Sequence, residues 1–281
     1  MIGLATAAAA RAVDADLPLL EQILPDARVV VWDDPAVDWS AFDVVVIRSA
    51  WDSHRRRAEF VAWAKAVATG TSLWNRADVV EWNTDKRYLC DLVASGFPVV
   101  PTSFVAPGDH APDDLEGDLI VKPSVGASSE GVVRTSDPGE AIAHVRRLHR
   151  DGFTAMVQPF VADAGGSPET ALVYLAGRFS HAVHKSVTLP ETVRMPGDAA
   201  ATADAAASET VAAHVPTAAE RSLGDRIVRW LPDTAYARVD LLSSADGPLV
   251  LEVELTEPSL FLDADPGAPA RAAAAFRSLA G

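Results

Sequence analysis

Residues 120–134 read Ile120-Val-Lys-Pro-Ser-Val-Gly-Ala-Ser-Ser-Glu-Gly-Val-Val-Arg134, a pattern of a buried strand that ends in a lysine and runs into a loop of small residues. Small side chains let backbone N–H groups approach phosphate oxygens, and Lys122 adds a positive charge at the end of the strand. The stretch predicts a polyphosphate clamp, although it matches neither the G-x-x-x-x-G-K-S/T loop nor the G-x-G-x-x-G turn. The alternative is an ordinary Gly-Ser hairpin loop with a surface lysine.

Two apolar strand patterns near the C-terminus carry a second charged cluster. They are Tyr236-Ala-Arg-Val-Asp-Leu-Leu242 and Leu249-Val-Leu-Glu-Val-Glu-Leu255. Alternation places Arg238 and Asp240 on one face of the first strand, and Glu252 and Glu254 on one face of the second. Carboxylates this close repel one another unless a cation compensates, and hard oxygen ligands suit Mg²⁺ held against phosphates. These carboxylates are therefore candidate metal ligands, and the alternative is the solvated outer face of a hairpin.

The first third of the chain alternates short apolar strands with helical patterns, which predicts a parallel β-α-β layout. The strands are expected at 2–6, 28–32 and 44–48, and the helices at 16–24, 59–68 and from Asn83 or Thr84 to Gly96.

The second third suggests a small α+β lid. Its strands are expected at 119–122, 155–158, 171–175 and 179–184, with a helix at 141–149 between them. Residues 190–216 are low in bulky apolar side chains, so a mobile loop is expected there. Helices are expected at 218–231 and about 269–279.

Composition limits the function. The 281 residues include 24 Lys plus Arg and 39 Asp plus Glu, and the net charge of −15 argues against nucleic acids and anionic membranes as partners. The single cysteine, Cys90, excludes an intramolecular disulfide and a cysteine-rich zinc site. No stretch has the apolar length of a membrane span, and the N-terminus lacks a signal-peptide pattern. We therefore expect a soluble, cytoplasmic protein.

Single polar residues at element ends are further candidates. Lys86 lies in the first turn of an expected helix, where a cation is unfavourable unless an anion is near. Glu169 precedes a strand and Lys185 follows one. Taken alone, each of these three residues is better explained by a solvated surface position.

The segment Arg48-Ser-Ala-Trp-Asp52 follows an apolar strand run. It therefore lies at the carboxyl end of an expected parallel strand, where α/β proteins place ligands. Arg48, Ser49 and Trp51 are candidate substrate-binding residues on this ground. The alternative is a structural tryptophan beside an ion pair.

In their order and spacing, these segments resemble the ATP-grasp superfamily, in particular D-alanine–D-alanine ligase and its small relatives. The matching segments are Thr84-Asp-Lys-Arg-Tyr-Leu, Gly96-Phe-Pro-Val-Val-Pro-Thr, Ile120-Val-Lys-Pro-Ser, Gln158-Pro-Phe-Val, Glu169-Thr-Ala-Leu-Val-Tyr, Ala237-Arg-Val-Asp and Leu251-Glu-Val-Glu. The resemblance is closest to the cycloserine synthetase branch. That branch is indicated by Arg48-Ser-Ala-Trp-Asp52, Trp82-Asn-Thr-Asp-Lys-Arg-Tyr-Leu89, Phe179-Ser-His-Ala-Val-His-Lys185 and Glu257-Pro-Ser-Leu-Phe-Leu262.

The resemblance implies which residues bind the nucleotide. Lys86 and Lys122 would contact its phosphates, and the loop 124–131, with Ser128 and Ser129, would close over them. The segment 158–161, with Gln158, Phe160 and Val161, would lie beside the adenine. Glu169 would accept the ribose hydroxyls.

The resemblance also implies a catalytic centre. Lys185 would approach the phosphates and Arg238 the transferred group or the substrate, while Asp240, Glu252 and Glu254 would hold the metal ions. Many superfamily members have Asn where this chain has Glu254, so the extra charge there implies a nearby Mg²⁺ or a changed coordination.

The fold and reaction that follow from the resemblance are those of an ATP-grasp ligase. The fold would be α/β with an α+β lid, divided into an N-terminal parallel-sheet domain at 1–98, a lid at 99–185 and a metal-bearing part at 186–281. With ATP and Mg²⁺, the enzyme would phosphorylate a small amino-acid-like substrate, and an amine would attack the acyl phosphate.

Three questions stay open from the sequence. The enzyme could be an intramolecular cyclo-ligase, acting as cycloserine synthetase does on O-ureidoserine. The Glu254 variation could instead leave a non-catalytic nucleotide-binding protein. The chain could also form a homodimer.

Overall fold

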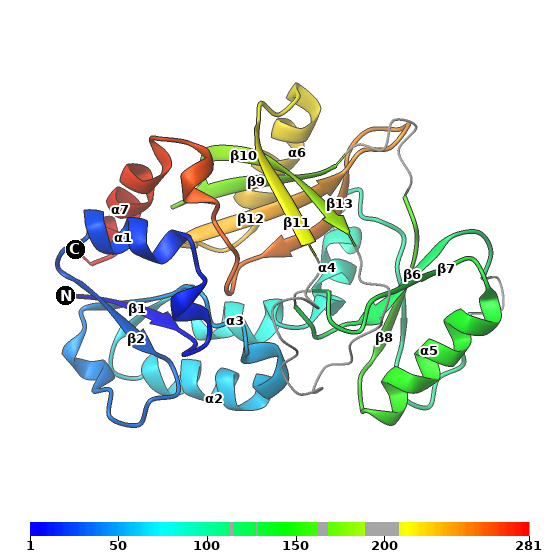
Figure 1. Ribbon diagram of the computed structural model, residues 1–281, viewed down its shortest axis with the longest axis horizontal. Helices are drawn as coiled ribbons and strands as arrows, with labels where there is room; N and C mark the ends of the chain where they lie inside the picture. Colours follow the sequence, from blue (N-terminus) through cyan, green and yellow to red (C-terminus); the bar gives the residue numbers. More distant parts are fainter. Residues whose placement is uncertain (113–114, 128, 162–167, 189–207, 281) are drawn as a thin grey trace.

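The computed structural model describes residues 1–112, 115–127, 129–161, 168–188 and 208–280. Its strands form three sheets. Figure 1 shows the N-terminal sheet and the sheet of β6, β7 and β8 on opposite sides of the molecule, with the third sheet above and between them. The expected α/β class is confirmed.

The N-terminal sheet is parallel and has the strand order β2-β1-β3-β4. Its strands are β1 (Ile2–Thr6), β2 (Ala27–Val31), β3 (Val44–Ile47) and β4 (Ser72–Trp74). The helices of this region are α1 (Asp16–Ile23), α2 (Arg57–Val67), α3 (Ala77–Asn83) and α4 (Leu89–Ala94). Short 3₁₀ helices are η1 (Ala10–Ala12), η2 (Trp39–Ala41), η3 (Ser53–Arg56) and η4 (Lys86–Tyr88). The predicted β-α-β layout is therefore correct, with β4 and α3 added to it.

The glycine predicted to end the helix after Asn83 does so. Gly96 has φ +79°, in the left-handed region that glycine adopts without steric cost. Phe97 then donates its N–H to the carbonyl of Leu92 over 3.0 Å, which turns the chain away from α4.

The lid sheet is antiparallel and has the order β5-β8-β6-β7. It consists of β5 (Ser103–Val105), β6 (Leu119–Pro123), β7 (Val133–Thr135) and β8 (Ala155–Pro159), and α5 (Pro138–Arg150) packs on it. The side chain of Asp137 caps α5 by accepting the N–H of Gly139 over 2.7 Å. The α+β lid is therefore present.

The third sheet is antiparallel and has the order β11-β10-β9-β12-β13. Its strands are β9 (Glu169–Leu175), β10 (Arg178–Thr188), β11 (Ser208–His214), β12 (Tyr236–Leu242) and β13 (Leu249–Glu254). Helices α6 (Ala218–Trp230) and α7 (Ala268–Ser278) and the 3₁₀ helix η6 (Leu262–Ala264) complete the chain. Because β9 pairs with β12, the lid sheet ends at β8, before the predicted lid boundary at residue 185.

One prediction in this region is wrong. Residues 208–214 were expected to belong to a loop, but they form β11, which pairs with β10 from His214 to Ser208. An edge strand needs backbone hydrogen bonds on one side only, so few bulky apolar side chains are required there. Residues 215–216 form no helix or strand, as expected, and residues 190–207 lie outside the described residues.

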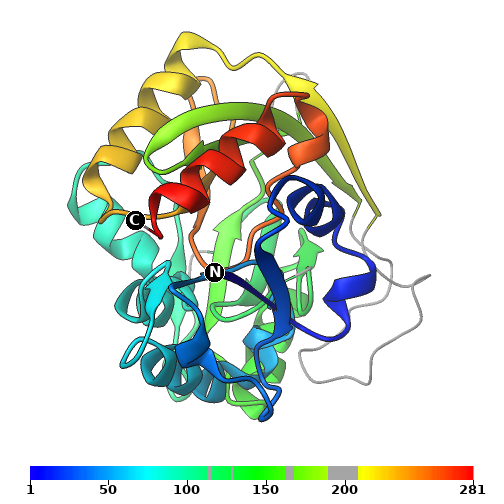
Figure 2. The same ribbon diagram turned by 90° about the vertical axis from the view of Figure 1, so that its left-hand side faces the viewer.

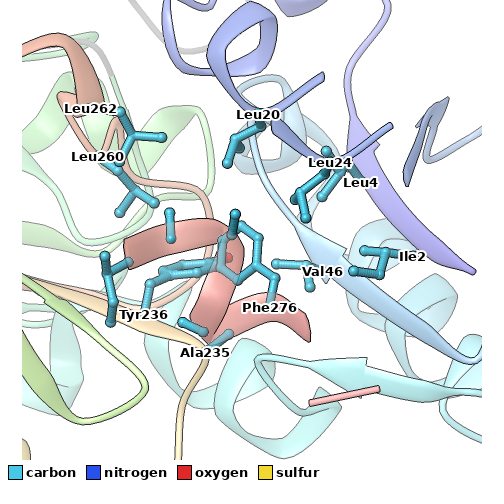
Figure 3. Close-up of a cluster of buried hydrophobic side chains, with 14 of the residues drawn as sticks. Ile2, Leu4, Leu20, Leu24, Val46, Ala235, Tyr236, Leu260, Leu262 and Phe276 are labelled. Carbon is cyan, nitrogen blue, oxygen red and sulfur yellow. The ribbon is translucent and has the colours of Figure 1, made fainter. Parts of the chain in front are cut away.

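A shared core joins the N-terminal sheet to the third sheet. Figure 3 shows Phe276 of α7 and Tyr236 of β12 among side chains from β1, β3 and α1. Figure 2 shows α7 beside this N-terminal region. Packing of this kind fixes the strands of the third sheet relative to the ends of β1 and β3. No helix in the described part of the chain is long and apolar enough to cross a membrane.

Candidate functional site

A cavity of about 720 Å³ lies where the lid sheet, the third sheet and the N-terminal region meet. Most of the candidate residues line it. They are Trp51, Lys86, Lys122, Ser129, Gln158, Phe160, Val161, Glu169, Lys185, Arg238, Asp240, Glu252 and Glu254. Ser128 lies outside the described residues. The structure therefore brings segments together that are far apart in the sequence.

Lys122 lies on β6, next to the small-residue loop. Burial lowers the pKa of its ammonium group. It forms no ion pair with any residue that the structure describes. A cation that is buried without a carboxylate partner is suited to an anionic ligand.

Lys86 connects the same loop to the third sheet. Its Nζ donates to the carbonyl of Gly126 over 2.7 Å and lies 3.0 Å from Oε1 of Glu252. Burial alone would lower the pKa of Lys86, but the Glu252 carboxylate outweighs burial and raises it. Lys86 is therefore charged and held directly below the loop.

Lys185 and two carboxylates form a buried cluster across three strands. Its Nζ lies 2.7 Å from Oδ2 of Asp240 and also pairs with Glu169 on β9. Burial raises the pKa of Glu169. Burial would raise the pKa of Asp240 too, but Arg238 and Lys185 outweigh it and hold that pKa well below its usual value. Asp240 is therefore ionised.

Arg238 connects the two strands whose alternation was predicted. Its Nε lies 2.9 Å from Oδ1 of Asp240 and its Nη2 2.9 Å from Oδ2, and Nη2 also pairs with Glu254 on β13. The register pairs Arg238 with Glu254 and Asp240 with Glu252. Its Nη1 donates to the carbonyl of Ser259 over 3.1 Å. The predicted convergence of these side chains is present in the structure.

Each of the three proposed metal ligands forms an ion pair with a cationic side chain. Asp240 and Glu254 pair with Arg238, and Glu252 pairs with Lys86, and within the described residues no three such groups are already arranged around a metal position. Burial raises the pKa of Glu254, so the neighbouring cations do not fully compensate its charge. A donor set of carboxylate oxygens with uncompensated charge fits Mg²⁺.

The segment after β8 forms another wall. Phe160 and Val161 line the cavity directly after this strand. The guanidinium carbon of Arg134 lies 3.5 Å from the centre of the Phe160 ring, which holds the ring in place. The amide of Gln158 donates to the hydroxyl of Thr102 over 2.8 Å, so its side chain braces the wall.

Arg48 and Ser49 do not reach the cavity, in contrast to the prediction. Arg48 is 1% exposed, and its Nη2 lies 3.4 Å from Oδ2 of Asp16 and donates to the carbonyl of Pro258 over 3.0 Å. Ser49 is 1% exposed, and its Oγ lies 2.7 Å from Oγ1 of Thr6. The chain that follows β13 covers Arg48, and Ser49 is buried against the end of β1. For Arg48, the alternative interpretation given above, a structural role in an ion pair, agrees with the structure.

Trp51, from the same segment, does line the cavity. Its Nε1 donates to the carbonyl of Glu257 over 3.0 Å. This contact fixes the chain after β13 against the N-terminal region.

Sequence reasoning gave no role to three ionisable side chains that line the cavity, His54, Glu130 and Glu257. Nε2 of His54 lies 2.9 Å from Oε2 of Glu130. Burial raises the pKa of Glu257 to about 8, and its Oε2 has no hydrogen-bond partner within the described structure. The Glu257-Pro-Ser segment was recognised only as part of the resemblance, because nothing in its local pattern indicates a binding site.

Comparisons with known proteins show which family this chain resembles. The profile of the family described as D-cycloserine synthetase DcsG, N-terminal domain, matches residues 2–75. The cycloserine biosynthesis protein DcsG of Streptomyces lavendulae is 38% identical over 282 residues, which cover 93% of each chain. A crystal structure of D-cycloserine synthetase DcsG matches with a TM-score of 0.83 and 35% identity over 99% of both chains.

More distant solved structures share the fold. D-alanine–D-alanine ligase from Bacillus anthracis, complexed with ATP, matches with a TM-score of 0.64 and 14% identity, over 99% of this chain and 96% of that one. The ATP-grasp ligase PsnB, complexed with a precursor variant, Mg and ADP, matches with a TM-score of 0.63 and 14% identity, over 100% and 98%. With the 38% identity across nearly the whole chain, these matches show that the chain belongs to the D-cycloserine synthetase family of ATP-grasp, ATP-dependent ligases.

Proposed function

We propose that this ligase phosphorylates the carboxylate of a small amino-acid-like substrate and then closes a ring within the same molecule. The observation that carries the proposal is the convergence of cationic and acidic side chains in one cavity. The cations are Lys86, Lys122, Lys185 and Arg238, and the acids are Asp240, Glu252 and Glu254. The likeness to D-cycloserine synthetase favours the intramolecular form of the reaction over attack by a second molecule.

The nucleotide would lie between the lid sheet and the third sheet. Lys122 is suited to its phosphates because it is a half-buried cation without a carboxylate partner among the described residues. Lys86, tied to the carbonyl of Gly126, would hold the loop over them. Phe160 and Val161 would supply an apolar wall for the adenine, and Glu169 would accept the ribose hydroxyls.

Mg²⁺ would be held by Asp240, Glu252 and Glu254. When bound, it would neutralise negative charge on the phosphates during transfer. Lys86 and Arg238 pair with these carboxylates in the structure, so both would have to give up part of those contacts. The ammonium group of Lys86 and the guanidinium of Arg238 would then face the phosphates.

The protein would contribute alignment and charge rather than a nucleophile. A substrate carboxylate oxygen attacks the γ-phosphorus of ATP, the bond to the β-phosphate oxygen breaks, and ADP and an acyl phosphate form. A nitrogen of the same substrate then attacks the acyl carbon, phosphate leaves with the electron pair of the C–O bond, and the nitrogen loses its proton. Arg238 and Lys185 would stabilise the charge that develops on the transferred group.

The test measures ADP release across a panel of small amino acids that includes O-ureidoserine, with mass analysis of each product. We expect Mg²⁺-dependent ADP release with a single substrate present, and a product whose mass matches a closed ring. Release that requires a second amine would replace ring closure by intermolecular ligation. The absence of release with every compound would contradict the proposed substrate class.

We also propose a cellular location and an oligomeric state for this enzyme. We place the enzyme in the cytoplasm, because ATP is available there and an exposed free thiol such as Cys90 stays reduced. We propose a homodimer because the large apolar side chains Val93 and Trp230 are 59% and 39% exposed. Light scattering on the purified protein tests the dimer.

A further inference from the structure

Nearly every carboxylate that lines the cavity has a cationic partner. The ion pairs are Glu130 with Arg55, Glu169 with Lys185, Asp240 with Lys185 and Arg238, Glu252 with Lys86, and Glu254 with Arg238. Glu257 differs, because it pairs with no Lys, Arg or His among the residues that the structure describes. It is therefore the acidic counterpart of Lys122, a cation of the cavity that also forms no ion pair within the described part of the chain.

The carboxylate of Glu257 is also poorly hydrogen-bonded. Its Oε2 is shielded from solvent and has no partner within the described structure, and its Oε1 has only the hydroxyl of Ser53 at 3.5 Å. Leaving a buried carboxylate unsatisfied costs stability, since the desolvation of the charge is not repaid. A cationic ligand would provide the missing partner.

The backbone around Glu257 is held firmly, so the position of this carboxylate is defined. Trp51 donates to the carbonyl of Glu257, Arg48 donates to the carbonyl of Pro258, and Arg238 donates to the carbonyl of Ser259. These bonds tie the segment 257–259 to the N-terminal region at one end and to Arg238 at the other. Glu257 thus lies two residues before the carbonyl to which Arg238 donates, and Arg238 is the arginine that would meet the transferred group.

We propose that Glu257 binds the α-ammonium group of the substrate and so selects amino acids over analogues that lack this group. The inference rests on the proposed function, since Arg238 would meet the group transferred to the substrate carboxylate and Glu257 would hold the ammonium end of the same small molecule. The two unpaired charges of the cavity then have separate ligands. Lys122 faces the phosphates of the nucleotide, and Glu257 faces the substrate.

Mg²⁺ is the alternative cationic partner for Glu257, because carboxylate oxygens bind both Mg²⁺ and ammonium groups. The ammonium is favoured because Glu257 is tied to Trp51 and Ser53 of the N-terminal region, whereas the three metal ligands lie on β12 and β13. The experiment separates the two sources. An effect on Mg²⁺-ATP would identify a metal ligand, and an effect on the amino group would identify a substrate contact.

The experiment compares O-ureidoserine with its desamino analogue, in which hydrogen replaces the α-amino group. Affinity for each is measured as the KM or the inhibition constant in the ADP-release assay, with wild-type protein, Glu257→Gln and the control Glu21→Gln, which changes an exposed glutamate on α1. We expect the wild type and the control to prefer the amino compound at least tenfold. Glu257→Gln should reduce this preference to within about threefold, with the KM for Mg²⁺-ATP changed less than twofold.

Each result bears on whether Glu257 binds the ammonium group of the substrate. If Glu257→Gln keeps the full preference, or raises the KM for Mg²⁺-ATP as strongly as that for the substrate, the ammonium assignment is wrong. If the wild type does not discriminate between the two compounds, the ammonium assignment is also wrong. This comparison needs no variant, so it applies even if Glu257→Gln fails to fold. If the wild type releases no ADP with any amino acid, the proposed function fails, and that result is distinct from all of these.

Discussion

Nε2 of His54 lies 2.9 Å from Oε2 of Glu130, so a side chain of η3 touches the loop that follows β6. Arg55 also pairs with Glu130. Burial alone would raise the pKa of Glu130, but the hydrogen bonds from His54 and Arg55 outweigh it and lower that pKa to about 2. Glu130 is therefore ionised at neutral pH and fastens the small-residue loop across the cavity to the N-terminal region.

Glu130→Gln should loosen this loop. The amide keeps the shape of the side chain but loses the charge-assisted contacts, which contribute about 1.5–3 kcal/mol each in general. We expect the KM for ATP to rise about tenfold, and limited proteolysis to cut the loop faster. The control Glu116→Gln changes an exposed glutamate outside the cavity and should alter neither quantity. An unchanged KM would mean that the loop closes without the contacts to His54 and Arg55.

Lys122→Ala should abolish turnover without unfolding the protein. This lysine has no carboxylate partner among the described residues, and burial already lowers its pKa, so its removal leaves no charge unpaired. The loss of one charged contact to the phosphates should cost about 3 kcal/mol in the transition state, or a hundredfold or more in rate. ADP release and thermal unfolding measure the two effects. The exposed Lys65→Ala serves as the control, and wild-type turnover in Lys122→Ala would contradict the phosphate clamp.

Sequence patterns were most informative where burial is strong and local. The apolar runs of β3 and β12 predicted both strands, and alternation along β12 and β13 predicted which charged side chains would converge. In contrast, β4 has only three residues, and β11 is an edge strand whose stability comes from pairing with β10. Pairing with a distant partner leaves little signal in the local sequence.

The same limit explains the errors at the site. The end of a parallel strand is a good place for a ligand, but only the tertiary structure decides whether another segment covers it. Arg48 and Ser49 were predicted to bind substrate for this reason, but the chain around Pro258 covers Arg48, and Ser49 is buried against Thr6. Glu257 was overlooked because its significance lies in the absence of a partner, which depends on all the described side chains around it.

Arg48 should therefore affect stability more than substrate affinity. Arg48→Met removes the cation that pairs with the buried Asp16, whose carboxylate would then keep only the N–H groups of Leu260 and Leu262. Breaking a buried pair in this way costs about 3–5 kcal/mol. Urea unfolding measures the loss, and the exposed Arg28→Met is the matched control. A variant as stable as the wild type, with a raised substrate KM, would restore Arg48 as a substrate contact.

The ligand-free protein should lose stability as the pH rises, partly through Glu257. Its pKa is 4.5 for an unburied glutamate and about 8 in the folded protein, so the folded state binds the extra proton between these values. The contribution to the free energy of unfolding is therefore complete below about pH 4.5 and falls as the pH rises to about 8, by on the order of a few kcal/mol.

Glu257→Gln removes this one dependence. Its free energy of unfolding should exceed that of the wild type increasingly from pH 5 to pH 8, as measured by urea titration at each pH. Glu21→Gln should follow the wild type throughout. Parallel curves for Glu257→Gln and the wild type would show that the carboxylate is solvated or paired in solution.

Glu252 and Glu254 provide a matched pair of tests for Mg²⁺. A ligand at a hundred times its Kd stabilises the folded state by about 2.7 kcal/mol, which corresponds to an increase in Tm on the order of 5 °C or more. We expect that increase with ATP and Mg²⁺, and much less with ATP and a chelator.

Glu252→Gln should lose the Mg²⁺-dependent part and the activity, because it removes a charged ligand and leaves Lys86 with the carbonyl of Gly126. Glu254→Asn keeps an oxygen donor while removing a carboxylate whose pKa burial raises, so it should retain the Mg²⁺-dependent increase with altered activity. If Glu252→Gln kept the full increase, the carboxylates of β12 and β13 would serve only to orient Lys86, Lys185 and Arg238.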